Sequence, residues 1–156
     1  LFFKPRTSLI GPGDPIRLPP QSEQVQHEAE LAVIIGKRGR WIQAEEAMAH
    51  VFGYTIANDV TARDLQRSDT QWTRGKGFDT FCPLGPWIET EVTDPQTLGI
   101  RSRLNGKVMQ ESNTALLIFN VRKLISYISD AMTLLPGTVL LTGTPDGVGM
   151  ARDPQV

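Results

Sequence analysis

The sequence predicts an α+β fold in which β-strands predominate, and three observations support this fold class. Short runs rich in β-branched and aromatic residues recur along the chain, separated by Gly, Pro, Asn or Asp. Asn105-Gly106 lies between two such runs and is the strongest short-range signal for a β-hairpin. The longest stretch with helical spacing of apolar residues is 114–128. Many short strands with few helices are typical of an α+β domain.

The first third of the chain is predicted to be extended segments and strands around one short helix. Residues 1–20 are rich in proline and turn residues and show no helical period. A β-branched run predicts a strand over 25–36, and the basic stretch 36–40 is interpreted as a solvated turn. Strong helix formers predict a short helix over 44–50. A strand is expected over 51–58.

A helix is expected to begin at Thr61, which would act as its N-cap with Asp64 three residues later. Residues 66–80 are polar and contain glycine, so they are expected to form a loop. A strand interrupted by Gly85-Pro86 is predicted over 84–91.

The last third contains the hairpin, the longest helix and a final strand. Residues 98–105 and 107–110 are the two predicted hairpin strands. The helix is expected over 114–128. A turn at Leu135-Pro136-Gly137 leads to a strand over 138–142 and then to the loop 143–149.

Length and composition place the chain among ordinary globular proteins, and 1–156 is treated as one domain. It has 156 residues, 40% of them hydrophobic, and a net charge of -1, so no nucleic acid or membrane partner is predicted. No apolar run reaches the ~18 residues of a membrane helix. The single cysteine, Cys82, excludes an internal disulfide and fits the cytoplasm. The apolar start without Met and the end in a loop suggest truncation at both ends.

Acidic side chains at the ends of two predicted strands indicate a metal site. Glu28 and Glu30 are two apart on a predicted strand, so both project from the same face. Two carboxylates held that close repel each other unless a positive charge lies between them, and hard divalent cations prefer oxygen ligands. Asp59 follows the second strand and is a third candidate ligand. The alternative is a solvated strand face, but Ala32 and Ile34 indicate that this face becomes buried.

A second group of polar residues follows Asp59. Arg63 and Gln66 lie four and seven residues after it, and share its face if a helix begins near Asp59. Because arginine binds carboxylates through two parallel hydrogen bonds, Arg63 is a candidate for binding an acidic substrate. The alternative is a surface ion pair between Arg63 and Asp64 or Asp69.

Two further candidates lie in glycine-rich stretches. Lys76 stands between Gly75 and Gly77, which let the backbone approach a ligand, and it would neutralise substrate charge. Thr144 lies in the loop 143–147 directly after a buried strand, where its hydroxyl and the backbone N–H groups could face an anion. The alternative for Lys76 is a lysine on a surface loop, and the alternative for the loop 143–147 is an ordinary turn.

Taken in series, these motifs resemble the fumarylacetoacetate hydrolase family, in particular its C-terminal catalytic domain and bacterial members of the acylpyruvase and 2-hydroxyhepta-2,4-diene-1,7-dioate isomerase type. The matching segments run in order along the chain: Glu28-Ala29-Glu30-Leu31, 53–66, 75–79, Leu104-Asn105-Gly106 and 136–149. The resemblance implies a mixed β-sandwich roll, a homodimer, and Mg²⁺, Mn²⁺ or Ca²⁺ as the cofactor.

The resemblance also implies roles for individual residues. It implies three metal ligands, all acidic: Glu28, Glu30 and Asp59. It implies a substrate-binding set of side chains that donate to or neutralise an acid: Arg63, Gln66, Lys76 and Thr144. Lys76 would also be catalytic, because its charge would lie at the oxygen where negative charge develops.

The leading functional prediction is a metal-dependent hydrolase that cleaves a C–C bond in small 2-oxo acids of aromatic catabolism, such as acylpyruvates or fumarylpyruvate. The metal would stabilise the enolate left by bond breaking. One alternative is a decarboxylase or isomerase of oxaloacetate-like or 2-hydroxyhepta-2,4-diene-1,7-dioate-type acids. Another is a non-catalytic domain that binds metal or ligand. Hydrolytic members carry a His and Glu pair N-terminal to the position of Phe3, ahead of the first residue here.

Overall fold

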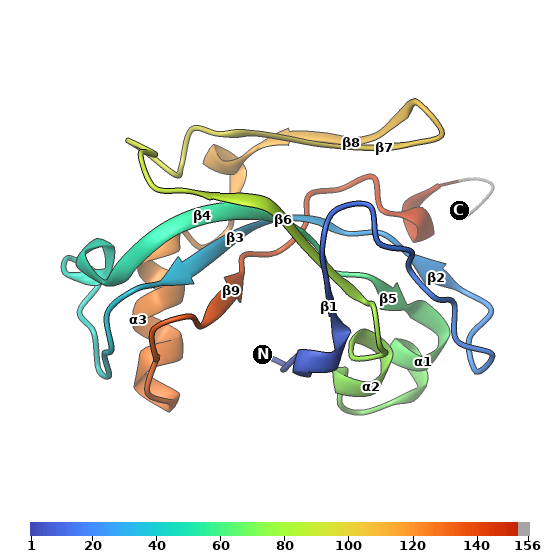
Figure 1. Ribbon diagram of the computed structural model, residues 1–156, viewed down its shortest axis with the longest axis horizontal. Helices are drawn as coiled ribbons and strands as arrows, with labels where there is room; N and C mark the ends of the chain where they lie inside the picture. The colour runs from blue at the N-terminus through green and yellow to red at the C-terminus, as the bar shows by residue number, and fades with distance from the viewer. Residues whose placement is uncertain (153–156) are drawn as a thin grey trace.

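A curved five-stranded mixed sheet forms the centre of the structure, a computed structural model that describes residues 1–152 (Figure 1). β1 pairs parallel with β6, whereas the β6–β4, β4–β3 and β3–β9 pairs are antiparallel. The strands in order across the sheet are β1 (Leu9–Ile10), β6 (Cys82–Glu89), β4 (Val51–Asn58), β3 (Ala29–Ile35) and β9 (Val139–Leu141). The predicted β-rich α+β class is confirmed.

The main hydrophobic core lies between this sheet and helix α3 (Val121–Ala131). All seven residues of β3 are buried, which agrees with its continuous apolar run. α3 buries Val121, Ile125 and Ile128 at helical spacing. The core cluster also contains residues from the sheet and loops: Leu31, Val33, Ile35, Ile42, Ala47, Tyr54, Leu134 and Leu140.

The helix predicted over 114–128 begins later than expected, at Val121. The Asn120 side chain accepts a hydrogen bond from the Lys123 N–H and caps α3. The segment before it forms only a short 3-10 helix, η3 (Thr114–Leu116). The apolar period of the sequence spans both segments, so the cap, and not the period, decides where the long helix begins.

Three smaller predictions are wrong in detail. The predicted strand 25–36 is divided into β2 (Val25–Gln26), which pairs with β5 (Thr61–Ala62), and β3. Thr61 is therefore a strand residue and not an N-cap, and its hydroxyl donates to the Asp59 carbonyl at 2.8 Å. Helix α1 (Arg63–Ser68) starts after it, and the predicted loop 66–80 contains α2 (Thr73–Lys76).

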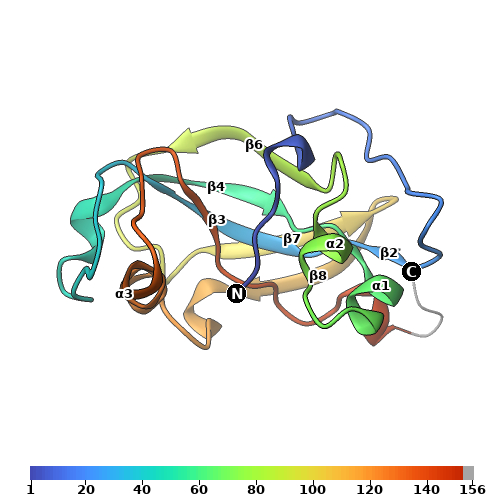
Figure 2. The same cartoon turned by 90° about the horizontal axis from the view of Figure 1, so that it is seen from below.

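The hairpin formed by β7 (Gly99–Leu104) and β8 (Lys107–Asn113) is as predicted, with Asn105 and Gly106 at positive φ in its turn. It forms a separate layer on the side of the sheet opposite α3 (Figure 1). In both ribbon views α3 and the α1–α2 pair lie at opposite ends of the structure (Figure 2). β8 buries Met109 and Gln110, so the hairpin contributes to the interior.

The remaining elements are short 3-10 helices. They are η1 (Arg6–Ser8), η2 (Ala47–His50) and η4 (Gly149–Ala151), and η2 occupies the end of the helix predicted over 44–50. The longest helix within residues 1–152 is α3 with 11 residues, so no helix in that range could span a membrane.

Candidate metal centre and active site

Three buried carboxylates meet where the start of β3 faces the end of β4. These strands are antiparallel, with Ala29 opposite Asn58, so Glu28 and Asp59 lie side by side and the Asp59 N–H donates to the Glu28 carbonyl at 2.8 Å. Glu30 is the second residue of β3. One carboxylate oxygen from each of Glu28, Glu30 and Asp59 lies within 4.8 Å of the others. Their exposed fractions are 6%, 3% and 1%, so the alternative of a solvated strand face is wrong.

Three cationic side chains neutralise this acidic cluster. The Lys76 Nζ lies 2.8 Å from Glu28 Oε2 and 2.6 Å from Asp59 Oδ2. The Arg63 Nη2 lies 2.5 Å from Glu28 Oε1, and the Lys4 Nζ lies 2.6 Å from Asp59 Oδ1. Four of these side chains are buried and that of Lys4 is 9% exposed, and a charge without a partner would be strongly destabilising in such surroundings. The formal charges of the three acids and the three bases balance.

Glu30 is the exception, because it forms no ion pair with any residue in the range 1–152. Its Oε2 accepts one hydrogen bond from the Gly143 N–H at 2.6 Å. Burial raises the pKa of Glu30 to about 8, and the neighbouring Asp59 and Glu28 charges act in the same direction. A bound cation would remove this penalty. An all-oxygen carboxylate set with one acid lacking a cationic partner therefore fits a hard divalent ion.

Lys76 reaches the cluster because two short helices pack closely. A Cβ on Gly75 would lie 2.9 Å from the Gln66 N, and a Cβ on Gly77 would lie 2.4 Å from the Thr73 carbonyl oxygen. Gly75 thus allows the close approach of α2 to α1, whereas Gly77 avoids a clash with the carbonyl of Thr73 within α2. Lys76 itself is 2% exposed, so it is not a surface lysine.

Arg63 and Gln66 also lie at the cluster, although not for the predicted reason. α1 begins at Arg63 and not near Asp59, so the three residues do not share one helix face. Arg63 donates from Nη1 to Gln66 Oε1 at 2.7 Å, and from Nε to Gln26 Oε1 at 3.1 Å. The alternative surface pairs with Asp64 or Asp69 are wrong, because the guanidinium is directed inward to Glu28.

Thr144 lies beside the first residues of β3. Its hydroxyl donates to the Ala29 carbonyl at 2.9 Å and accepts from the Gln110 Nε2 at 2.8 Å. The preceding residue, Gly143, contacts Glu30 as described above. The loop after β9 therefore borders the acidic cluster.

Sequence analysis missed two residues at the site, Lys4 and Gln110. Lys4 lies in the segment expected to be merely extended, and it contacts Asp59 across 55 residues of sequence. It also donates to the Lys76 carbonyl. Its one sequence signal is its position in the apolar stretch Leu1-Phe2-Phe3-Lys4-Pro5. Gln110 lies in a predicted strand, and nothing in the local pattern showed which of its polar residues turns inward.

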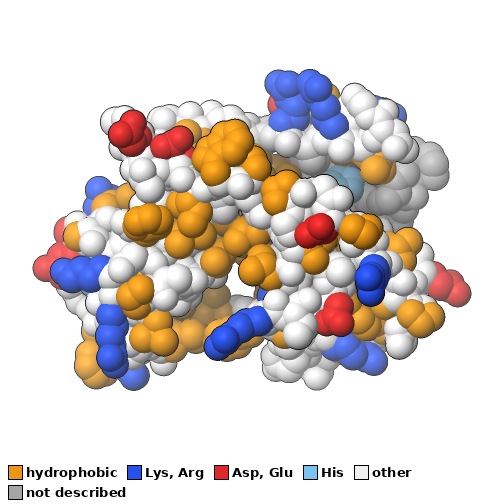
Figure 3. All heavy atoms as spheres, in the orientation of Figure 1, with side chains coloured by type: hydrophobic (Ala, Val, Ile, Leu, Met, Phe, Trp, Pro, Cys, Tyr) orange, Lys and Arg blue, Asp and Glu red, His pale blue; other side chains and the backbone are white. Residues whose placement is uncertain are grey.

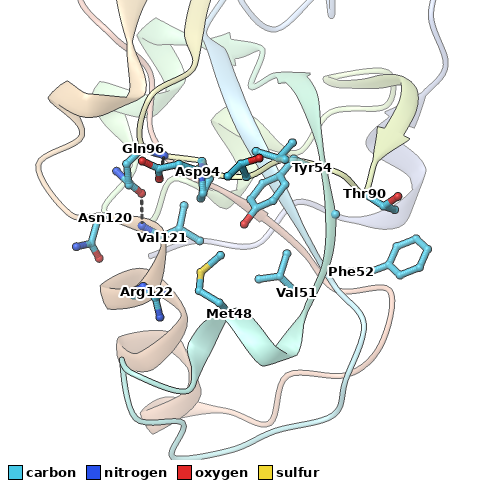
Figure 4. Close-up of a pocket in the computed structure, with 14 residues that line it drawn as sticks. Met48, Val51, Phe52, Tyr54, Thr90, Asp94, Gln96, Asn120, Val121 and Arg122 are labelled. Carbon is cyan, nitrogen blue, oxygen red and sulfur yellow. Dashed lines mark hydrogen bonds between the residues drawn. The ribbon is translucent and has the colours of Figure 1, made fainter.

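A separate hollow of about 390 Å³ lies at the other end of β4 (Figure 4). Tyr54, Asp94, Arg122 and Gln96 are among the side chains that surround it. None of the predicted metal or substrate residues lines this hollow. It is therefore distinct from the acidic cluster.

The class of protein is defined by a curved, β-rich sheet in which three buried carboxylates and their cationic partners gather at the ends of two central strands, β3 and β4. The chain belongs to the fumarylacetoacetate hydrolase family, because the family profile described as "Fumarylacetoacetate (FAA) hydrolase C-terminal" matches residues 1–156. The predicted family is thus confirmed.

Three relatives illustrate the range of this similarity. "Oxaloacetate tautomerase FAHD2A, mitochondrial" from Bos taurus is 53% identical over 160 residues, which cover 100% of this chain and 51% of the relative. The structure of 2-hydroxyhepta-2,4-diene-1,7-dioate isomerase from Mycobacterium marinum has a TM-score of 0.93 and 53% identity over 95% of this chain and 58% of that one. The structure of fumarylacetoacetate hydrolase from Exiguobacterium antarcticum has a TM-score of 0.95 and 45% identity over 99% of this chain and 57% of that one. The chain spans about half the length of the Bos taurus relative.

Proposed function

We propose that the protein containing this chain is a divalent-metal-dependent isomerase that interconverts the keto and enol forms of a 2-oxo acid, with oxaloacetate as the leading substrate. The observation that carries the proposal is the buried cluster of Glu28, Glu30 and Asp59, set among three cationic side chains. The names of the tautomerase and isomerase relatives favour the alternative of the sequence analysis over its leading hydrolase prediction.

The three acids of the cluster would hold Mg²⁺, Mn²⁺ or Ca²⁺. When bound, such an ion supplies a Lewis acid that polarises the 2-oxo group. Glu30 is held in place by the Gly143 N–H, and Asp59 by two lysines. Glu28 is held by Arg63 and Lys76, so each carboxylate is oriented by neighbours of this chain.

Charge balance supports a dianionic substrate. The three acids and three bases of the cluster sum to zero, so a divalent cation would leave a net charge of +2 in a buried site. A 2-oxo dicarboxylate such as oxaloacetate carries the matching two negative charges. Arg63 and Gln66 would lie beside one carboxylate and supply positive charge and amide donors, and the backbone N–H groups of the Thr144 loop would face the other.

Lys76 is the proposed catalytic group. In the keto-to-enol direction a C–H bond next to the 2-oxo group breaks and an O–H bond forms on that oxygen. The reaction consumes neither water nor a redox partner. The Lys76 ammonium lies between Glu28 and Asp59, where its charge would stabilise the oxygen as negative charge develops on it.

A second candidate function is the hydrolysis of a C–C bond in a β-diketo acid, because the Exiguobacterium antarcticum relative is named as a hydrolase. This reaction needs the same polarised oxygen but also a base that activates water. Decarboxylation of oxaloacetate would likewise start from the polarised 2-oxo group.

One experiment distinguishes these functions. The protein, saturated with Mg²⁺, is mixed with enol-oxaloacetate, and the loss of the ultraviolet absorbance of the enol is followed while NMR identifies products. Isomerisation predicts faster conversion to the keto form with all carbons retained, and Asp59→Asn should reduce it to the buffer rate. Formation of pyruvate and CO₂ would instead indicate decarboxylation. Hydrolysis is tested with an acylpyruvate as the substrate, from which it would release pyruvate and a second acid. Tight binding of oxaloacetate without any turnover would refute the enzymatic proposal and support a non-catalytic domain.

We also propose that the protein forms a homodimer. Apolar side chains gather on the face shown in Figure 3, and Phe52 and Ile56 of β4 and Trp87 of β6 are exposed. Large exposed apolar side chains gathered on one face are typical of protein interfaces. Light scattering should give twice the monomer mass, and a monomer at micromolar concentration would contradict the proposal.

A further inference from the structure

A buried amide joins the hairpin to the candidate site. Gln110 of β8 is 1% exposed, and all four of its hydrogen-bonding positions are used. Its Oε1 accepts from the Ala29 N–H and from the Ser102 hydroxyl, both at 3.0 Å. Its Nε2 donates to the Thr144 hydroxyl at 2.8 Å and to the Pro145 carbonyl at 2.9 Å. The side chain thus joins three segments that are distant in sequence.

The amide of Gln110 has only one orientation that satisfies these partners. The Ala29 N–H can only donate and the Pro145 carbonyl can only accept, so exchanging the amide oxygen and nitrogen would lose both hydrogen bonds. The Thr144 oxygen must therefore accept from Gln110, and its own proton is directed to the Ala29 carbonyl. Gln110 thereby fixes the orientation of the Thr144 hydroxyl within the loop.

The two segments that Gln110 connects both carry groups of the acidic cluster. Ala29 lies between Glu28 and Glu30, so its N–H belongs to the backbone that holds both acids. Thr144 directly follows Gly143, whose N–H donates to Glu30. A shift of the loop relative to β3 would therefore change the surroundings of Glu30 and the position of Thr144 together.

We propose that Gln110 is a positioning residue, which holds the loop 143–145 against the start of β3 and so sets the geometry of the carboxylate-binding side of the site. It contacts no acid of the cluster and acts through Ala29, Thr144 and Pro145. Its ordering of the loop is independent of the reaction catalysed, whereas its effect on substrate binding rests on the proposed function.

The test replaces Gln110 by methionine, which keeps the length of the side chain and removes all four hydrogen bonds. Amide hydrogen exchange at 143–147 should become at least about tenfold faster, because the loop loses its anchor, while exchange within β3 at 31–35 stays unchanged. In steady-state kinetics with oxaloacetate and Mg²⁺, KM should rise about tenfold and kcat should change by less than about threefold.

Gln96→Met is the matched control. The Gln96 side chain also bridges two segments, since its Oε1 accepts from the Val121 N–H at 2.9 Å and its Nε2 donates to the Thr114 carbonyl at 3.2 Å (Figure 4). It lines the hollow near Tyr54 and not the acidic cluster. The same chemical change should therefore lower the melting temperature without changing exchange at 143–147 or KM.

Ser102→Ala provides a milder variant if Gln110→Met does not fold. It removes one of the two hydrogen bonds to the Gln110 Oε1, so exchange at 143–147 should rise about threefold. Unchanged exchange at 143–147 in Gln110→Met, with only a loss of stability as in the control, would overturn the inference even if the enzyme is active. Faster exchange in a protein that converts no 2-oxo acid would uphold the positioning role and refute only the proposed function.

Discussion

Replacing Glu30 by glutamine should stabilise the metal-free protein and weaken metal binding at the same time. Glu30 is the acid of the cluster that forms no ion pair within residues 1–152. Burial, Asp59 and Glu28 raise its pKa from 4.5 to about 8. Glutamine has nearly the same shape, keeps an oxygen to accept from the Gly143 N–H, and carries no charge.

The magnitude follows from the difference between the folded and unfolded pKa values of Glu30. Because the folded pKa is raised, the folded chain keeps the proton that the unfolded chain loses between pH 4.5 and about 8. The contribution of Glu30 to stability is thus most favourable below pH 4.5 and falls as the pH rises to about 8. At pH 7 the penalty is about 3 kcal/mol, since one pKa unit corresponds to about 1.4 kcal/mol. Glutamine carries no charge and avoids this penalty, so the melting temperature of the metal-free Glu30→Gln variant at pH 7 should be higher by roughly 6–12 °C.

The assay is thermal unfolding in EDTA at pH 5, 7 and 8, with Mg²⁺ calorimetry on metal-free samples from which the EDTA has been removed. The advantage of Glu30→Gln should shrink to about 1 kcal/mol at pH 5, because this pH lies only slightly above the unfolded pKa of 4.5. Mg²⁺ affinity should fall at least about tenfold, because one of three anionic ligands is lost.

Glu28→Gln is the matched control, because the same chemical change two residues away should have the opposite effect on stability. Glu28 pairs with Arg63 at 2.5 Å and Lys76 at 2.8 Å, so its loss leaves two buried cations poorly compensated and should destabilise by roughly 3–5 kcal/mol. If Glu30→Gln is less stable than the unmodified protein at pH 8 in EDTA, the reasoning about Glu30 is refuted. If its Mg²⁺ affinity is unchanged, Glu30 is not a ligand.

Three further predictions concern the same site and its supporting loop. Since a proton must leave Glu30, Mg²⁺ affinity should rise by up to about tenfold per pH unit between pH 6 and 8 and level off above about 8, and calorimetry giving a flat profile would contradict this. Lys76→Met should lower kcat on oxaloacetate by about 10²–10³ in steady-state assays, and an unchanged kcat would remove Lys76 from the catalytic set. Gly147→Ala should lower the free energy of unfolding in urea by at least about 1–3 kcal/mol, because φ is +89° and the Cβ would lie 2.4 Å from the Met109 carbonyl. Gly99→Ala is the control, because a Cβ on Gly99 would have no other atom within 4 Å, and it should change the free energy of unfolding by much less.

Local patterns in the sequence were enough to predict most strands and the three acids. The apolar run of β3, the Asn105-Gly106 turn and the apolar strand that ends at Asp59 each act over a few residues. The acids were found because a strand places Glu30 at a known spacing from Glu28, and because the next strand brings Asp59 back. Helix starts were less predictable, since α3 begins where the Asn120 side chain caps it and not where the apolar period begins.

The sequence by itself determined that this chain has a β-rich fold and carries acidic, basic and amide groups suited to a metal and a 2-oxo acid. Only the tertiary structure decided how those groups neutralise one another. Lys4 meets Asp59 across 55 residues, and Gln110 meets Ala29 across 81. Such contacts depend on how strands and loops pack, whereas hydrophobic periodicity records only which face of each segment is buried. A buried polar group is stable only beside its partner, so the fold as a whole selects which polar residues enter the site.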